Sequence, residues 1–358
     1  MDVNSVRECA SKIRDNVGSV IVGKRDVIDI LISALIAGGH ALLEDVPGTG
    51  KTTLAKALAR SIGVKFKRVQ FTPDLLPSDL TGIYYFNQKE SRFMFRAGPV
   101  FTNILLADEI NRATPRTQSS LLECMEERQV TIDGKTHFLA EPFFVIATEN
   151  PIETHGTFPL PEAELDRFLV KIRIGYPTIE EGREIFARFG SGNPLETLEP
   201  VCTAEDITAA RSVCAGVETT PEIEEYILRI AENTRSAETV RLGVSPRGSL
   251  ALLRVAKVFA AIHGRAFVTA DDVKTLAPHV LSHRIIIRDA SALRGGSGTD
   301  VVRSILDSTP APVEDLQSLR NGHRRAADEP AFPSCHHRHD LRFPAAVLCS
   351  SLFRSYPI

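Results

Sequence analysis

ALLEDVPGTGKTT, residues 41–53, is the stretch that decides the fold. Its first half is a mainly apolar run that predicts a strand over residues 41–46. A glycine-rich turn follows, and residues 51–62 then place apolar side chains on one stripe of a helix that Gly63 is positioned to end. A strand, a glycine-rich turn and a helix in this order form the context that a phosphate-binding loop requires.

The turn carries the groups that hold a nucleotide phosphate. Backbone N–H groups and the positive end of the following helix surround phosphate oxygens, Lys51 reaches the β- and γ-phosphates, and the Thr52 hydroxyl ligates Mg²⁺. The expected phosphate-binding residues are Pro47, Gly48, Thr49, Gly50, Lys51, Thr52 and Thr53. Asp45 occupies the first glycine position of the usual pattern, where we expect it to tolerate a left-handed backbone. The alternative is a chance glycine-rich turn.

Four further segments predict the other strands of one sheet, and two of them, residues 103–108 and 143–148, are nearly continuous apolar runs, as strands covered on both faces should be. Together with the first, the expected strands span residues 41–46, 64–71, 103–108, 143–148 and 170–176. Segments of helical periodicity alternate with them, which is typical of βαβ units around a parallel sheet. We therefore expect an α/β fold in which residues 1–176 form a core with a five-stranded parallel sheet between helices.

After Pro177 the pattern is helical only. Several of these helices begin with a hydroxyl residue followed by an acid three positions later, which indicates reciprocal capping. The pairs are Thr178 with Glu181, Thr203 with Asp206, and Thr269 with Asp272. We expect a smaller all-helical domain over residues 177–310, and a disordered or non-native tail over residues 311–358, where no periodicity is sustained.

Two segments of the first half predict β-hairpins. Asp133-Gly134 separates two alternating stretches within residues 128–139, a strong signal for a tight turn. The connection over residues 72–100 is too long for an ordinary loop, and its aromatic residues flank a polar tip, so we expect an inserted hairpin there. The alternative is that these aromatic side chains cover the edge of the core.

Two acids and an amide follow predicted strands. Asp108 and Glu109 end the third strand, and Asn150 follows the fourth, at the edge where open α/β sheets bind ligands. Asp108 would hold Mg²⁺ through water, Glu109 would polarise the water that attacks the γ-phosphate, and the Asn150 amide would orient it. Taken alone, the acids also fit a solvated strand end, and Asn-Pro also fits a simple turn.

Two arginines are further candidates. Arg167 lies on a short predicted helix whose apolar residues face the core, and a lone arginine there is usually just solvated. Arg247 follows Ser245 and Pro246 at the start of a predicted helix, where a cation meets the positive helix end. An anion must offset that charge, either a nucleotide phosphate or a neighbouring carboxylate.

Length, charge and composition exclude several classes of protein. A chain of 358 residues exceeds what one hydrophobic core usually supports. With 42 basic against 45 acidic residues, the chain has no overall positive charge that would attract nucleic acid, so we expect no nucleic-acid partner. No apolar run is long enough to cross a membrane and no signal sequence is recognisable, so we expect no membrane partner and a cytoplasmic location. The six cysteines form no CxxC pair, and we expect them to be reduced.

In this order, these motifs resemble those of AAA+ ATPases of the MoxR family. The resemblance covers roughly residues 3–310. The stretches that carry it are FTPDLLPSDLTG (71–82), FRAGPVF (95–101), LADEINRATPRTQSSLLECMEERQVTIDG (106–134), IATENPIETHGTFPLPEAELDRFLVKI (146–172) and GVSPRGSLALLRVAK (243–257). Asp45 and the tail after about residue 314 depart from the family pattern.

The resemblance implies a role for each candidate. The 84–95 hairpin matches the helix-2 insert, and the 128–139 hairpin precedes sensor 1, which is Asn150. Arg167 matches the arginine finger that acts on a neighbouring subunit's ATP, and Arg247 matches sensor 2, acting on the ATP of its own subunit. Gly23 matches the segment on the adenine side.

The resemblance further implies Mg²⁺-dependent ATP hydrolysis by a homo-oligomeric ring, expected to be hexameric. Such a ring would act like a chaperone that remodels or matures partner complexes, commonly with partners that carry von Willebrand factor A domains. Three other functions stay open: a nucleic-acid motor, a motor of the magnesium-chelatase type, and a scaffold that senses ATP without turnover.

Overall fold

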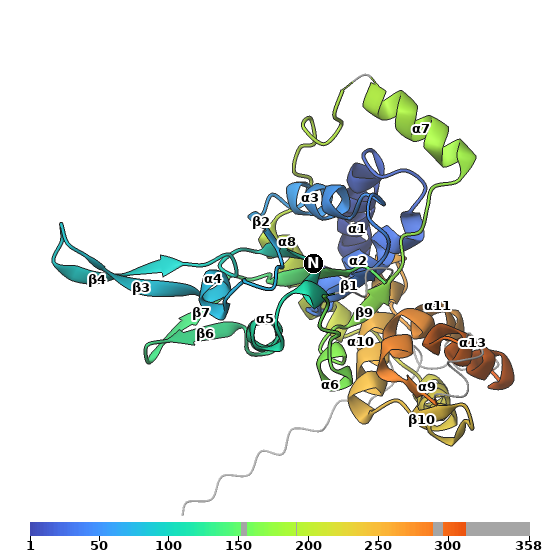
Figure 1. The fold of residues 1–358 in the computed structure, drawn as a ribbon. Coiled ribbons are helices and arrows are strands. Elements are labelled where there is room, and N and C mark those ends of the chain that lie inside the picture. Colours follow the sequence, from blue (N-terminus) through green and yellow to red (C-terminus); the bar gives the residue numbers. More distant parts are fainter. Residues whose placement is uncertain (152–155, 191, 289–295, 313–358) are drawn as a thin grey trace, which may run out of the picture. The chain divides into compact units, whose positions relative to one another are not determined.

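A five-stranded parallel sheet lies within the first half of the chain (Figure 1). In spatial order its strands are β2 (Phe66–Gln70), β5 (Ile104–Asp108), β8 (Phe144–Glu149), β1 (Ala41–Glu44) and β9 (Val170–Ile172). Each neighbouring pair is parallel. The predicted α/β fold class is confirmed, and all five strands fall within the predicted runs or one residue beyond.

Helices cover both faces of this sheet, because alternate side chains of each strand point to opposite sides. On one side Leu43, Ile104 and Leu106 belong to the same apolar cluster as the helices α1, α2 and α3. On the other side Leu42 and Leu105 pack with the apolar residues of α5. These helices span Val3–Gly18 (α1), Arg25–Ile36 (α2), Lys51–Ser61 (α3) and Pro115–Glu127 (α5).

The structure describes residues 1–151, 156–190, 192–288 and 296–312. Of the segment expected to be a disordered or non-native tail, residues 313–358 lie outside the described residues. Within the described part of the chain, no helix combines the length and the apolar character needed to cross a membrane.

Both segments predicted as hairpins form antiparallel strand pairs. The first, preceded by α4 (Pro77–Thr81), joins β3 (Gly82–Asn87) to β4 (Arg92–Ala97), and the second joins β6 (Gln129–Ile132) to β7 (Lys135–Phe138). The second turns at Asp133 and Gly134, which have φ of 48° and 75°. Positive φ at both central residues is what a tight hairpin turn needs to match the strand twist.

The aromatic side chains of the first hairpin do not all cover the core edge. Phe86 and Phe93 are 52% and 70% exposed and contact each other, with ring centroids 5.4 Å apart. Closer to the body, Tyr84 and Phe95 pack on His137 of the second hairpin, and the Tyr84 hydroxyl lies 3.1 Å from its Nε2. The two hairpins therefore lie side by side (Figure 1).

The second half of the chain is mainly helical. Its helices are α7 (Ile179–Gly190), α8 (Ala204–Ala215), α9 (Pro221–Ser236), α10 (Pro246–Ile262), α11 (Ala270–Leu281) and α13 (Gly298–Ser308), with the short η2 (Ser282–Arg284). Thr203 and Thr269 form the predicted capping boxes with Asp206 and Asp272. Thr178 and Glu181 exchange the equivalent hydrogen bonds.

The expectation of a helices-only second half needs one correction. A short antiparallel pair, β10 (Val240–Leu242) and β11 (Ile286–Ile287), joins segments that flank α10 and α11. Runs this short give too little alternation to be recognised in a sequence. Helix α10 also packs against α1 and α2, so the apolar core runs continuously from the first half into the second. The domain boundary near residue 176 stays a prediction.

Candidate nucleotide-binding site

The phosphate-binding loop leaves β1 and leads into α3. Gly48 and Gly50 have φ of 86° and 85°, in the left-handed region that favours glycine. A Cβ added at either residue would meet no heavy atom within 4 Å, so the backbone conformation, not crowding, requires glycine here. Gly50 is the N-cap of α3, and the N-terminal end of a helix favours a bound anion.

Lys51 and Thr52 lie in the first turn of α3. The Lys51 ammonium donates to the carbonyl oxygens of Asp45 at 2.6 Å and Val46 at 3.2 Å. Burial lowers the pKa of Lys51, and the carboxylates of Asp45, Asp108 and Glu109 act against this shift. The ammonium is therefore within electrostatic reach of the acids that follow β5.

Asp45 has a different role from the one expected. Its φ is not positive, since the non-glycine residues with positive φ in the described chain are Ser91, Glu109, Arg128 and Asp133. Instead its carboxylate accepts hydrogen bonds from the backbone N–H groups of Ile174 at 3.0 Å and Gly175 at 2.7 Å. Asp45 thus ties the phosphate-binding loop to the segment that follows β9.

Asp108 is fixed by both neighbouring strands of β5. Its Oδ1 accepts from the Thr148 hydroxyl of β8 at 2.6 Å, and its Oδ2 accepts from the Arg68 guanidinium of β2 at 2.7 Å. Asp108 is 8% exposed. The Asp108 carboxylate and the Thr52 hydroxyl supply oxygen ligands of the kind that Mg²⁺ prefers, so their chemistry fits this ion.

Glu109 adopts a left-handed backbone, with φ of 56° and ψ of 52°. Its N–H donates to the Thr148 hydroxyl at 2.9 Å. Its Oε2 accepts from the Gln70 amide at 2.7 Å and from the Arg112 guanidinium at 3.1 Å. The left-handed backbone, its bond to Thr148 and the two side-chain partners of the carboxylate hold that carboxylate in one place, as expected for a group that must orient water.

Asn150 follows β8 at the same edge of the sheet and is half-buried. The preceding residue, Glu149, pairs with Glu44 in the register of β8 and β1. Burial raises the pKa of Glu149 to about 7, Glu44 adds to this shift, and Lys171 opposes it. Glu44 itself forms ion pairs with Lys171 and Arg173 of the β9 segment.

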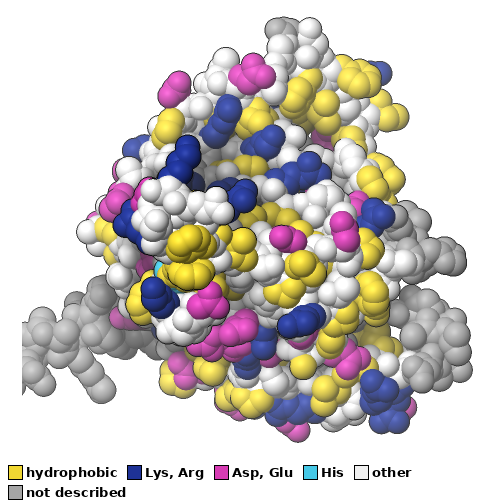
Figure 2. Space-filling model, turned by 60° about the vertical axis from the view of Figure 1, so that its left-hand side comes forward, with side chains coloured by type: hydrophobic (Ala, Val, Ile, Leu, Met, Phe, Trp, Pro, Cys, Tyr) yellow, Lys and Arg dark blue, Asp and Glu magenta, His cyan; other side chains and the backbone are white. Residues whose placement is uncertain are grey.

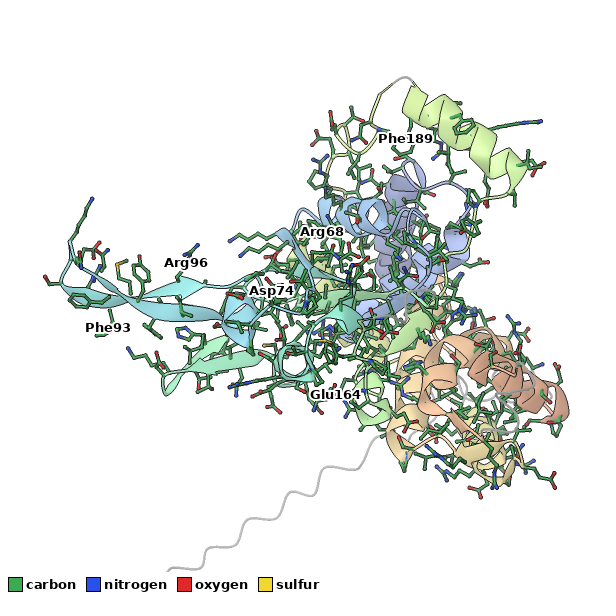
Figure 3. The ribbon with its side chains drawn as sticks, in the orientation of Figure 1. Arg68, Asp74, Phe93, Arg96, Glu164 and Phe189 are labelled. Atoms are coloured by element: carbon green, nitrogen blue, oxygen red, sulfur yellow. The ribbon has the colours of Figure 1, made fainter. Side chains whose placement is uncertain are left out.

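A cavity of about 250 Å³ lies beside the phosphate-binding loop. Its walls come from residues 20–24, from residues 48–53 and from residues 174–189, including Ile185 and Phe189 of α7. Figure 3 marks Phe189 on this helix. The apolar walls and the adjacent loop suit a ligand with a flat ring system and a phosphate chain.

Gly23 lies between two residues of this cavity wall, Val22 and Lys24. Its φ is 72°, and a Cβ added here would overlap the Glu181 side chain of α7. Glu181 forms an ion pair with Lys24 at 3.2 Å, and the Lys24 ammonium also donates to the Tyr176 carbonyl at 3.2 Å. Residues 21–24 are thus fastened to the start of α7.

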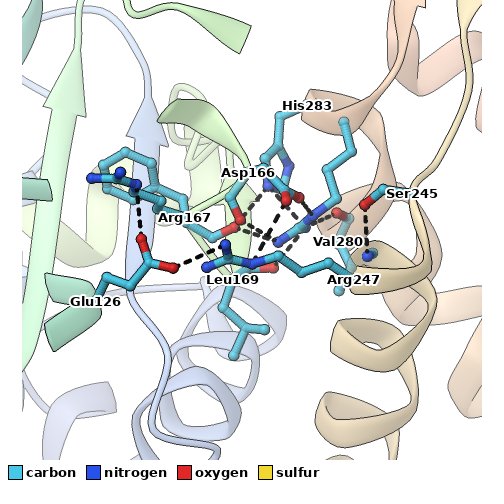
Figure 4. A network of polar contacts seen from close by, with 11 residues as sticks. Glu126, Asp166, Arg167, Leu169, Ser245, Arg247, Val280 and His283 are labelled. Carbon is cyan, nitrogen blue, oxygen red and sulfur yellow. Dashed lines mark hydrogen bonds and ion pairs between the residues drawn. The ribbon is translucent and has the colours of Figure 1, made fainter. Parts of the chain in front are cut away.

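Arg167 and Arg247 share one carboxylate (Figure 4). Arg167 Nε lies 3.1 Å from Glu126 Oε2, and an Arg247 terminal nitrogen lies 3.1 Å from Glu126 Oε1. Arg247 also lies 3.6 Å from Asp166, whose other oxygen accepts from Arg284 at 2.6 Å. Two carboxylates thus lie beside Arg247, and its contact with a nucleotide phosphate stays a prediction.

The structure thus arranges the candidates in two groups. Asp108, Glu109 and Asn150 lie at the carboxyl ends of the adjacent strands β5 and β8, and Lys51, at the start of α3, lies within electrostatic reach of the two acids. Arg167 and Arg247 form the second group, because both contact Glu126 of α5.

Several residues that contact the candidate site residues could not be identified from the sequence motifs. Gln70 and Thr148 lie at the carboxyl ends of the strands on either side of β5, so polar residues at strand ends could have indicated them. Glu126 and Arg284 lie in helical segments and carry no such signal.

Comparison with known proteins agrees with this geometry. A model of the ATPase family associated with various cellular activities (AAA) matches residues 40–170, and a model of the AAA lid domain matches residues 232–305. The uncharacterized protein YeaC of Bacillus subtilis is 49% identical over 85% of this chain and 95% of its own length. Chaperone MoxR1 of Mycobacterium tuberculosis is 39% identical over 82% of this chain and 80% of its own. A solved structure from Cytophaga hutchinsonii, 38% identical, has a TM-score of 0.81 and covers 87% of this chain and 97% of its own.

Proposed function

Because the chain belongs to the MoxR family of AAA+ ATPases, we propose that it binds ATP with Mg²⁺ and hydrolyses it to ADP and phosphate. One observation carries this proposal. The phosphate-binding loop follows β1, Asp108 and Glu109 lie at the end of β5, and Asn150 follows β8, and these three strands are neighbours in one parallel sheet. Their carboxyl ends meet at one edge, as a γ-phosphate and its attacking water require.

Each residue of this edge has a proposed task. Residues 47–53 and Gly23 bind the nucleotide, with Lys51 on the phosphates. Thr52 and Asp108 hold Mg²⁺, which neutralises phosphate charge when bound. Glu109 polarises the attacking water, and Gln70 and Arg112 keep its carboxylate in place.

We also propose that the chain works as a homo-oligomeric ring, expected to be hexameric. Arg167, as the arginine finger, supplies positive charge to the ATP of a neighbouring subunit. Since Arg247 shares Glu126 with Arg167, both guanidinium groups lie at one surface. This contact supports a revision of the expectation for Arg247: it serves the neighbour's nucleotide too, and not that of its own subunit.

The proposed role of the ring is to remodel or mature partner protein complexes, including proteins with von Willebrand factor A domains. MoxR1, a relative, is named a chaperone. The exposed Phe86 and Phe93 give the first hairpin an apolar tip that suits contact with protein (Figure 3). On the hairpin side, apolar side chains lie among basic and acidic ones (Figure 2). A cytoplasmic location fits this role, because ATP is supplied there.

The test is ATP hydrolysis measured against protein concentration, with and without Mg²⁺. We expect turnover per subunit to rise with concentration, because each site needs a neighbour. Glu109→Gln should still bind ATP and lose at least a hundredfold in turnover. ATP binding without turnover at any concentration, with a partner protein added, would instead support the ATP-sensing scaffold.

A further inference from the structure

Two cysteines far apart in the sequence lie face to face. Cys9 is on α1 and Cys202 directly precedes Thr203, the N-cap of α8, and their sulfur atoms are 2.8 Å apart. Both are buried, with exposed fractions of 6% and 7%. Cys124 and Cys214 are also buried free thiols, and no sulfur partner for them is found among the described residues.

The backbone around Cys202 is fixed to the same frame that carries Cys9. The N–H groups of Val201 and Cys202 donate to the Ser61 carbonyl at the end of α3, at 2.8 and 3.1 Å. Asn16 of α1 donates to the Ser61 hydroxyl at 3.0 Å and to the Glu199 carbonyl at 2.9 Å. These bonds hold residues 199–202 against α1, so the two sulfur atoms meet without a large backbone movement.

The surroundings also favour reaction of one of the two thiols. The contact with the Cys9 thiol lowers the pKa of Cys202, and the nearby Lys12 acts in the same direction, whereas burial and Asp206 act against this shift. The same contact raises the pKa of Cys9. A thiolate beside a thiol is the arrangement from which a disulfide forms, because the thiolate is the nucleophile.

We propose that Cys9 and Cys202 are a redox-modification site, at which hydrogen peroxide drives formation of a reversible disulfide. The Cys202 thiolate attacks one peroxide oxygen, the O–O bond breaks, and hydroxide leaves and takes up a proton as water. The resulting sulfenic sulfur of Cys202 is then attacked by the Cys9 sulfur, which gives up its thiol proton as the S–S bond forms, and the departing hydroxide takes up a proton and leaves as the second water. Two thiols lose two electrons and two protons, and one peroxide becomes two waters.

The disulfide would join α1 to the segment before α8 and close a loop that contains the whole parallel sheet. A cross-link of this length removes conformational entropy from the unfolded chain. We therefore expect the oxidised protein to melt several degrees higher than the reduced protein. This proposal does not depend on ATP hydrolysis.

The experiment uses the full chain with Cys335→Ser and Cys349→Ser, two cysteines outside the described residues. The protein is treated with hydrogen peroxide or dithiothreitol, unfolded in an alkylating reagent and digested for mass spectrometry. We expect a linked Cys9–Cys202 peptide after peroxide, its loss after dithiothreitol, and alkylated Cys124 and Cys214 in both samples. The melting temperature should rise with oxidation.

Two matched variants separate this site from general oxidation. Cys202→Ser should abolish both the linked peptide and the rise in melting temperature, whereas Cys214→Ser, at another buried thiol, should keep both. Cys9→Ser repeats the test from the other side. The proposal is overturned if Cys9 and Cys202 stay as alkylatable as Cys124, if peroxide yields their sulfinic acids instead of the link, or if Cys202→Ser keeps the thermal shift.

Discussion

Replacing Asp45 by glycine restores the usual glycine of a phosphate-binding loop, yet the structure predicts that Asp45→Gly damages the protein. The Asp45 carboxylate is 8% exposed and accepts the N–H groups of Ile174 and Gly175. A hydrogen bond to a charged group contributes about 1.5–3 kcal/mol, and a new glycine adds about 0.5–1 kcal/mol of backbone entropy in the unfolded chain. With the two bonds to this carboxylate counted as one contribution, because bonds to a shared charge are not additive, the expected loss in the free energy of unfolding is about 2–4 kcal/mol.

The same change should weaken nucleotide binding, because Ile174 and Gly175 line the cavity beside the loop. We expect ATP to bind roughly tenfold more weakly, which corresponds to about 1.4 kcal/mol. Urea unfolding measures the stability, and titration with a fluorescent ATP analogue measures the affinity. Asp45→Asn is the control: it keeps an oxygen acceptor without the charge, so it should lose only about 1 kcal/mol.

The result that would refute this reasoning is an Asp45→Gly protein whose free energy of unfolding stays within about 0.5 kcal/mol of the wild type. Tighter ATP binding by Asp45→Gly would refute it as well. Either outcome would mean that the contacts of Asp45 with the segment after β9 do not stabilise the loop.

Three other changes have defined outcomes. Gln70→Ala removes a donor to Glu109 and should lower kcat about three- to tenfold at unchanged ATP affinity, measured by steady-state hydrolysis and ATP titration. Glu126→Gln removes the ion pairs of Arg167 and Arg247, so kcat should fall severalfold. The free energy of unfolding should change by less than about 1 kcal/mol, because exposed ion pairs contribute little. Glu127→Gln, at the same end of α5, is the control and should change neither quantity. Glu149 has its folded pKa raised to about 7, so the native state holds a proton that the unfolded chain releases above about pH 4.5. The free energy of unfolding should therefore fall by roughly 2 kcal/mol between pH 4.5 and pH 8 because of Glu149. Urea unfolding at several pH values measures this fall, and Glu149→Gln should remove it.

The sheet could be predicted from sequence because β5 and β8 are apolar runs, β1 leads into a glycine-rich turn, and β5 ends in two acids. The turn at Asp133-Gly134 could also be predicted from the sequence, because tight hairpin turns favour these residue types. The phosphate-binding loop and the acids after β5 are contiguous motifs, so their place at one sheet edge follows once the strands are known.

What the sequence could not show are contacts between distant segments. Asp45 departs from a motif, but only the structure shows that it accepts N–H groups from residues 174–175. The shared contact with Glu126 of α5 brings together Arg247 of α10 and Arg167, which lies in the turn after the short helix Glu162–Leu165 and not on the helix predicted for it. Cys9 and Cys202 likewise meet only through the packing of α1 against the segment before α8. Strands β10 and β11 are too short to leave a pattern.

The central claim is that the active site is shared between subunits, with Arg167 and Arg247 acting on a neighbour's ATP. Mixing two inactive variants tests it directly. One variant is Lys51→Ala, which removes the lysine of its own phosphate-binding loop, and the other is either Arg167→Ala or Arg247→Ala. A shared site predicts that ATP hydrolysis returns in each mixture, because some interfaces combine an intact loop with an intact arginine. If either mixture stays as inactive as its components while the subunits still co-assemble, that arginine acts within its own subunit and the account is contradicted.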